Sequence, residues 1–111
     1  MRRIMCLSLL TAAVALLGAT ELKSAAPGSI TTVRIRDMQF QPSSVRVKVG
    51  DSVTWTNADD RDHSVNATDN SFQSGNLKPG ASYTYRFTKA GSFDYACSYH
   101  PRMRGSVQAD Q

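Results

Sequence analysis

The sequence predicts an all-β domain with the fold of a Greek-key β-sandwich, and three observations support this fold class. Short runs in which apolar and polar residues alternate recur from about residue 30 to residue 109, which is the pattern of half-buried strands. Glycine and proline turns separate these runs. An apolar repeat of 3.6 residues does not occur after the N-terminal segment. Short strands with turn signals between them favour two packed sheets.

The first half of the domain contains three predicted strands. Valine and isoleucine alternate with arginine in residues 31–36, and Met38 continues the apolar set of that strand. Residues 45–49 alternate valine with basic side chains. The Gly50-Asp51 pair is a turn signal, and it leads into a third strand over residues 53–57.

The second half begins with a long connection. Residues 58–78 are mostly polar, as expected where a Greek-key chain crosses from one sheet to the other. Aromatic and polar residues then alternate in residues 82–87 and again in residues 92–97, which predicts two more strands. A last short strand covers residues 106–109.

The first 26 residues have the composition of a secretory signal peptide. Arg2 and Arg3 form a positive start, and an apolar stretch runs from Ile4 to Ala19. The stretch is shorter than the roughly 18 residues that identify a membrane span, so we expect cleavage and no stable membrane insertion; a retained membrane anchor is the alternative. We place cleavage between residues 19 and 26 and the mature domain at residues 27–111. Secretion through such a peptide predicts a periplasmic protein.

Removal of residues 1–26 changes the charge and the cysteine count. Lys plus Arg falls from 13 to 10 and Asp plus Glu from 9 to 8, so the formal net charge falls from +4 to +2. The mature chain has no cluster of basic residues with interleaved aromatics, and we expect no nucleic-acid partner. It keeps one cysteine, Cys97, which has no second thiol for an internal disulfide. Metal ligation explains an odd thiol in an oxidising compartment.

Near the C-terminus, a cysteine, a histidine and a methionine have the spacing C-x2-H-x2-M. Cys97 ends a predicted strand, and His100 and Met103 lie on the short turn before Gly105. Thiolate and thioether are soft ligands that select copper, and imidazole also binds copper. Two histidines and a cysteine with a weak axial methionine form a blue-copper site. The second histidine must be His63, the only other histidine in the chain.

Each of these residues has a more ordinary interpretation when it is considered alone. Cys97 fits a buried core thiol, His100 an exposed loop residue, Met103 a core filler and His63 a solvated side chain. The mature chain, however, has its cysteine, both histidines and one of its two methionines where a copper site requires them. Met38 is the alternative thioether, but its predicted strand position favours packing, so Met103 is the predicted axial ligand.

The ligand motif and its flanks resemble the cupredoxins, and within them most closely the amicyanin type, in which a C-x2-H-x2-M loop precedes Arg-Gly. Plastocyanins and pseudoazurins are also similar, but they have a longer gap between the loop histidine and the methionine. The resemblance spans roughly residues 30–109, and its further matching segments are residues 47–57, 62–65 and 85–91. It implies a cupredoxin-like β-sandwich that binds one copper ion per chain through four ligands: His63, Cys97, His100 and Met103.

The resemblance also implies residues that support the ligands. Asn57 stands where similar cupredoxins have an asparagine that ties the histidine loop to the cysteine loop. Ser64 and Ser98 each follow a ligand, where they are placed to donate hydrogen bonds to the thiolate or to brace its loop. Ordinary turn residues are the alternative interpretation of all three.

The chain departs from the amicyanin type in two places. Arg61-Asp62 replaces an apolar Met-Pro before the first histidine, and Arg102 replaces a bulky apolar residue in the ligand loop. Both changes add charge near the expected docking face. The resemblance therefore does not transfer the usual partner of that type, methylamine dehydrogenase, to this chain.

These observations favour a soluble, monomeric one-electron carrier that exchanges electrons with redox partner proteins through His100. A copper storage, delivery or sensing protein that uses the same ligands is the alternative. We expect no enzyme activity, because two histidines cannot supply the further metal sites of an oxidase or reductase and no general acid–base pair is evident.

Overall fold

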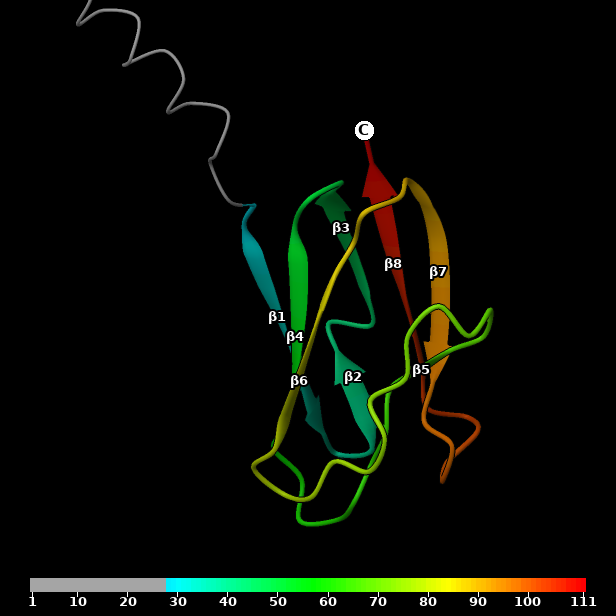
Figure 1. Cartoon of the computed structure of the whole chain (residues 1–111). Coiled ribbons are helices and arrows are strands. Elements are labelled where there is room, and N and C mark those ends of the chain that lie inside the picture. Colours follow the sequence, from blue (N-terminus) through cyan, green and yellow to red (C-terminus); the bar gives the residue numbers. More distant parts are fainter. Residues whose placement is uncertain (1–27) are drawn as a thin grey trace, which may run out of the picture.

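The computed structural model describes residues 28–111, which form two four-stranded sheets packed face to face (Figure 1). One sheet has the strand order β2-β1-β4-β6 and the other has the order β3-β8-β7-β5. The strands are β1 (Ile30–Arg36), β2 (Gln39–Gln41), β3 (Ser44–Lys48), β4 (Ser52–Asn57), β5 (Asn66–Ala67), β6 (Ser82–Arg86), β7 (Gly91–Ala96) and β8 (Arg104–Asp110). The predicted all-β sandwich is confirmed. The predicted signal peptide and its cleavage site lie outside the described residues.

The connections between strands make the sandwich a Greek key. β1 pairs with β2 and β7 with β8 as antiparallel neighbours, whereas every connection from β2 to β7 crosses between the sheets. Both sheets are mixed, because β1 pairs in parallel with β4, and β3 in parallel with β8. Within the described residues, no helix is long and apolar enough to cross a membrane.

The alternation predicted from the sequence determines which side chains are buried. In β4, Val53 and Trp55 are fully buried, whereas Thr54 and Thr56, which alternate with them, face outward. There Thr54 Oγ1 lies 2.7 Å from Thr84 Oγ1 on the neighbouring β6, a cross-strand pair that stabilises the outer face. The same period of two lets each sheet direct one apolar face toward the other.

Aromatic side chains fill the space between the sheets. Trp55 packs edge-to-face against Tyr95, with ring centroids 5.3 Å apart, and stacks on Phe72 at 5.5 Å. Tyr95 also meets Phe40 edge-to-face at 4.7 Å. Such aromatic pairs add to the free energy gained by burying their apolar surface.

Two local features differ from the sequence-based expectation. Met38 does not continue the first strand, because Asp37 and Met38 form a tight turn with φ values of 54° and 60°, and the Met38 side chain is 37% exposed. The long connection over residues 58–78 is not entirely loop, since it contains the short strand β5, which pairs with β7. Both features depend on contacts with distant segments and not on local alternation.

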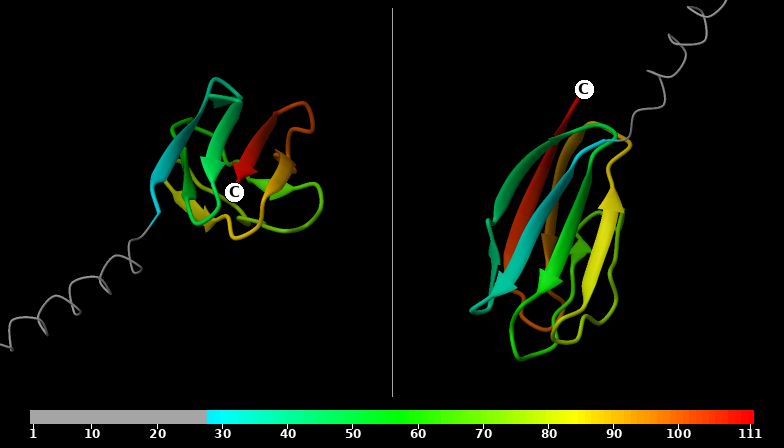
Figure 2. Two further views of the ribbon diagram at one scale, coloured as in Figure 1. Left: turned by 90° about the horizontal axis from the view of Figure 1, so that it is seen from above. Right: turned by 90° about the vertical axis from the view of Figure 1, so that its left-hand side faces the viewer.

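Three loops gather at the end of the sandwich opposite the C-terminus (Figure 1, Figure 2). They are the β1–β2 turn, the loop that follows β4 and the loop that follows β7. The β4 and β7 loops come from different sheets. This end of the molecule therefore brings together side chains that are far apart in the sequence.

Candidate metal centre

The loop after β7 is closed by its own backbone hydrogen bonds. Cys97 N–H donates to Met103 O at 3.1 Å, Met103 N–H donates to His100 O at 2.8 Å, and His100 N–H donates to Cys97 O at 3.3 Å. These bonds hold the three residues of the C-x2-H-x2-M motif on one tight turn. Cys97 is a free thiol and is buried.

His63 is positioned from the other side by the loop after β4. Its backbone pairs with Leu77 in an antiparallel bridge, with N···O distances of 3.0 and 2.7 Å. The Asn57 side chain reinforces this bridge, because its amide donates to Arg61 O at 2.7 Å and to Leu77 O at 2.9 Å. The expectation that Asn57 ties the histidine loop to the cysteine loop is therefore wrong. Its side chain instead ties the histidine loop, at Arg61, to Leu77.

The structure brings the predicted donor atoms together. Cys97 Sγ lies 3.9 Å from His63 Nδ1 and 3.7 Å from His100 Nδ1, and the ligand atoms of the three residues all lie within 4.8 Å of one another. Bonds of about 2.3 Å to sulfur and 2.0–2.1 Å to nitrogen, as zinc makes in proteins, separate a sulfur and a nitrogen donor in a trigonal plane by about 3.8 Å. The spacing thus fits one shared ion, and a cysteine with two imidazoles suits copper.

The four predicted ligands differ in exposure. His63, Cys97 and Met103 are 0%, 1% and 4% exposed, whereas His100 is half-buried. His63 is thus the enclosed histidine, and His100 is the one near solvent. Of the four predicted ligands, His100 would link a bound metal ion to the protein surface.

Both thioethers lie at this end of the sandwich. Met38 and Met103 line the same pocket of about 220 Å³, together with Arg102 and Arg104. Met103 is buried in the core beside Cys97, and its backbone is bonded to both Cys97 and His100. Met38 lies on the exposed β1–β2 turn, and the expectation that it packs in a strand is wrong. Met103 stays the predicted axial donor.

Serines on the two loops link the thiol to its surroundings, as expected. Ser64 N–H points at Cys97 Sγ from 3.3 Å, and the Ser64 hydroxyl lies 3.9 Å from the same sulfur. Ser98 N–H donates to Ser64 Oγ at 2.9 Å. The two loops are thus joined directly, and a backbone donor facing the sulfur stabilises a thiolate.

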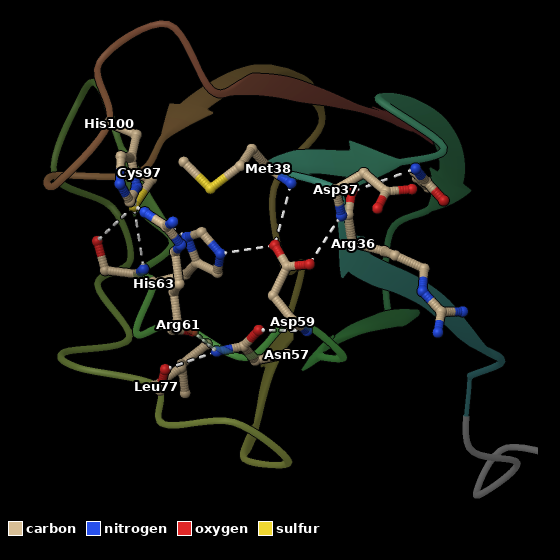
Figure 3. A network of polar contacts seen from close by, with 12 residues as sticks. Arg36, Asp37, Met38, Asn57, Asp59, Arg61, His63, Leu77, Cys97 and His100 are labelled. Carbon is tan, nitrogen blue, oxygen red and sulfur yellow. Dashed lines mark hydrogen bonds and ion pairs between the residues drawn. The ribbon is translucent and has the colours of Figure 1, made fainter.

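One residue that contacts the site was not singled out from the sequence. Asp59 Oδ2 lies 2.9 Å from His63 Nε2, the ring nitrogen that does not face Cys97 (Figure 3). Burial acts to raise the pKa of Asp59, but hydrogen bonds from Met38 N–H, His63 and Asp37 N–H outweigh it and lower the pKa below its usual value. The available signal was a carboxylate four residues before a predicted histidine ligand, because such ligands usually donate their second N–H to a carboxylate or carbonyl.

Comparison with known proteins agrees with this geometry. The family model described as a cupredoxin-like domain matches residues 8–109. The chain is 37% identical over 102 residues to amicyanin-alpha of Methylorubrum extorquens, a match that covers 87% of this chain and 85% of that protein. It is 39% identical over 72 residues to the chloroplastic plastocyanin of Tetradesmus obliquus, covering 55% of this chain and 50% of that protein.

The fold is also similar to a solved structure of an amicyanin variant in its Cu(I) form. The superposition covers 73% of this chain and 82% of the amicyanin chain, with a TM-score of 0.69 and 34% sequence identity. The predicted cofactor, one copper ion, is confirmed by this relationship together with the donor set at the loop end of the sandwich. The identity of each ligand stays a prediction. By its sequence, its fold and its cluster of donor atoms, the chain belongs to the cupredoxin family.

Proposed function

We propose that this protein is a periplasmic type 1 copper protein that carries single electrons between redox partner proteins. The observation that supports this most strongly is the cluster of one thiol and two imidazoles, whose donor atoms lie within 4.8 Å of one another. The family relationship supports it independently, because the chain covers 85% of an amicyanin. Bound copper supplies a one-electron couple, Cu(II)/Cu(I).

Four residues would hold the ion, each with a distinct role. Cys97 would bind as a thiolate, and His63 and His100 through the Nδ1 atoms that lie 3.9 and 3.7 Å from its sulfur. Met103 would add a weak axial thioether. The donors come from two loops already joined by the hydrogen bonds of Ser64, so the chain itself fixes their positions.

This arrangement favours electron transfer over catalysis. Backbone hydrogen bonds close the loop that carries three of the four proposed ligands. A site whose geometry changes little between Cu(II) and Cu(I) opposes electron transfer least. His100 is half-buried at the loop end, where a partner protein can approach it. We propose no enzyme activity and a monomer that acts through transient contacts with a donor and an acceptor.

Copper storage, delivery or sensing is the second candidate. The complete burial of His63 and Cys97 favours retention of the ion over its transfer to another protein. A reversible midpoint potential with fast self-exchange identifies the carrier. Slow self-exchange, with rapid loss of copper to a chelator, identifies the delivery protein.

The decisive test is the absorption spectrum of the mature protein, residues 27–111, after addition of copper(II). We expect an intense band toward the red end of the visible range, from charge transfer between the Cys97 thiolate and copper. Cys97→Ala should abolish the band, and Asp94→Asn, an exposed change on the same sheet, should leave it intact. A colourless copper(II) complex of the wild-type protein would exclude a type 1 site.

The location and the oligomeric state have their own tests. Expression of the full chain in a Gram-negative host, followed by release of the periplasmic fraction and mass measurement, gives the location and the cleavage site together. We expect cleavage between residues 19 and 26 and elution as a monomer. Retention of the intact chain in the membrane fraction would support an uncleaved anchor instead.

A further inference from the structure

We infer that Asp59 is a positioning residue for the copper site: its carboxylate fixes the ring orientation and tautomer of His63 and ties this ligand to the turn between β1 and β2. The inference rests on the proposed function, in which His63 binds copper through Nδ1. The supporting contacts are drawn in Figure 3.

The first step is the contact with the histidine. Asp59 Oδ2 lies 2.9 Å from His63 Nε2, and the two side chains are 13% and 0% exposed. A carboxylate can only accept a hydrogen bond, so Nε2 must carry the proton. The lone pair of the neutral ring is then on Nδ1, which is the atom that faces Cys97 Sγ at 3.9 Å. Asp59 thereby selects the tautomer that a metal requires.

The second step is the contact with the turn. Asp59 Oδ1 accepts a hydrogen bond from Asp37 N–H at 2.8 Å, and Oδ2 accepts one from Met38 N–H at 3.0 Å. Asp37 and Met38 both have positive φ, at 54° and 60°, a conformation that costs free energy for residues other than glycine. The carboxylate therefore stabilises the turn that holds it, and the turn holds the carboxylate against His63.

The third step concerns the loop that carries Asp59 itself. Asp59 N–H donates to Asn57 Oδ1 at 3.0 Å, while the amide of Asn57 holds the carbonyl groups of Arg61 and Leu77. Asp59 is thus fixed at its backbone and at both carboxylate oxygens. A side chain constrained at so many points is suited to orient a ligand, and its negative charge beside the imidazole increases the ligand's electron donation.

This geometry distinguishes aspartate from asparagine. The two carboxylate oxygens together accept three N–H groups, from Asp37, Met38 and His63. An asparagine has one acceptor oxygen and one amino group, so in either orientation its amino group faces at least one N–H donor. Asp59→Asn keeps the size of the side chain but cannot make the same set of hydrogen bonds.

The test compares Asp59→Asn with a matched control, Asp60→Asn. Asp60 is the next residue and is exposed, and its substitution by asparagine removes the same charge. Asp59→Asn should weaken copper affinity by about 10–100-fold, the usual cost of losing such a partner, and should raise the reduction potential more than the control does. Asp59→Glu should restore part of the wild-type potential, because it restores the carboxylate.

Two measurements on the metal-free protein complete the test. Nitrogen-15 chemical shifts in alkaline solution should show His63 protonated on Nε2 in the wild type and in Asp60→Asn, and a mixture of tautomers in Asp59→Asn. Amide exchange at Asp37 and Met38 should become about 10–100-fold faster only in Asp59→Asn, the factor expected from losing a hydrogen bond to a charged group.

The outcomes separate this inference from the proposed function. If wild-type protein gives the copper band, and Asp59→Asn matches Asp60→Asn in potential, tautomer and amide exchange, the inference is wrong and the carrier function stands. If wild-type protein gives no band, the proposed function is wrong, and an unchanged His63 tautomer in metal-free Asp59→Asn would overturn the positioning role as well.

Discussion

At the scale of single residues, two methionines are candidates for the axial position of the proposed copper site. Met38 and Met103 line one pocket at the loop end, but Met38 is on an exposed turn whereas Met103 is 4% exposed and joined by its backbone to Cys97 and His100. A weak axial donor must be held at a fixed place relative to the thiolate. Met103 is buried and lies on the closed loop, so we propose Met103 as the axial donor.

Met103→Leu should therefore raise the reduction potential while copper is retained, because loss of a thioether donor disfavours Cu(II) relative to Cu(I). Leucine has nearly the volume of methionine, so the free energy of unfolding of the metal-free protein should change by less than about 1.5 kcal/mol. Cyclic voltammetry of Met103→Leu and of its control, Met38→Leu, checks this. A shift confined to Met38→Leu would assign the axial position to Met38.

Single residues also show which features of the candidate site could be predicted from the sequence and which could not. The C-x2-H-x2-M spacing and the single remaining histidine were enough to predict which donors lie together, because soft ligands in that pattern have few other uses. The sequence did not show the role of Asp59, since its partners Asp37 and Met38 are more than 20 positions away and meet it only through the turn. The expectation for Asn57 came from the resemblance to cupredoxins and not from a local pattern, and the structure shows its amide bonded to Arg61 O and Leu77 O instead.

At the scale of elements, alternation predicted most strands, since a period of two can bury one face only in an extended chain. It failed where pairing is set by distant segments. Residues 66–67 are strand β5 only because β7 lies beside them, and the Asp37–Met38 turn depends on the carboxylate that binds its two N–H groups. Neither contact leaves a local pattern in the sequence.

The pairing of β7 with β8 depends on a glycine. A Cβ atom at Gly105 would collide with Cζ and Oη of Tyr95, which lies opposite it in the register. The Tyr95 ring is 1% exposed and packs edge-to-face on Trp55, and burial raises its pKa to about 12. The ring has little freedom to move, so β8 can approach β7 only with a residue that lacks a side chain.

Gly105→Ala should destabilise the metal-free protein by about 1–3 kcal/mol, the usual cost of overpacking a core. Urea unfolding followed by the fluorescence of the single tryptophan measures this. In the background of Tyr95→Leu, whose shorter side chain leaves the space open, the same change should cost clearly less. Equal costs in both backgrounds would show that the collision with Tyr95 is not the cause.

The start of β1 is held to the β3–β4 turn by Asp51. Its carboxylate accepts hydrogen bonds from Lys48 N–H at 2.9 Å and from Ser29 N–H at 2.8 Å, and these lower its pKa below the usual value of 3.8. A carboxyl group whose pKa is lower in the folded state stabilises the fold above its unfolded pKa. That contribution is lost as the pH falls through the folded pKa, which here lies below 3.8.

Asp51→Asn should therefore be less stable than the wild type at neutral pH, and the difference should shrink as the pH falls below about 4. Chemical unfolding over a series of pH values checks this. Asp94→Asn, which removes an exposed carboxylate on β7, serves as the control and should show a smaller difference. A difference between wild type and Asp51→Asn that persists unchanged at acid pH would contradict this account.

At the scale of the whole molecule, the candidate site joins the two sheets at one end. His63 follows β4 of one sheet, whereas Cys97, His100 and Met103 follow β7 of the other. Hydrogen bonds such as those of Ser64 with Cys97 and Ser98 hold this end together. The opposite end is held by backbone pairing, with Gly50 N–H bonded to Phe87 O at 2.7 Å.

A metal ion that binds only the folded state should stabilise the protein by about 4 kcal/mol at a free concentration of about 1,000 times its Kd. For a domain of this size, each kcal/mol raises Tm by about 4–8 °C. We expect copper to raise Tm and to slow amide exchange most in the loops after β4 and β7, because those loops carry its ligands. Cys97→Ala should lose most of both effects. Calorimetry and hydrogen exchange, with and without copper, test this, and an equal rise of Tm in Cys97→Ala would place the stabilising copper elsewhere on the molecule.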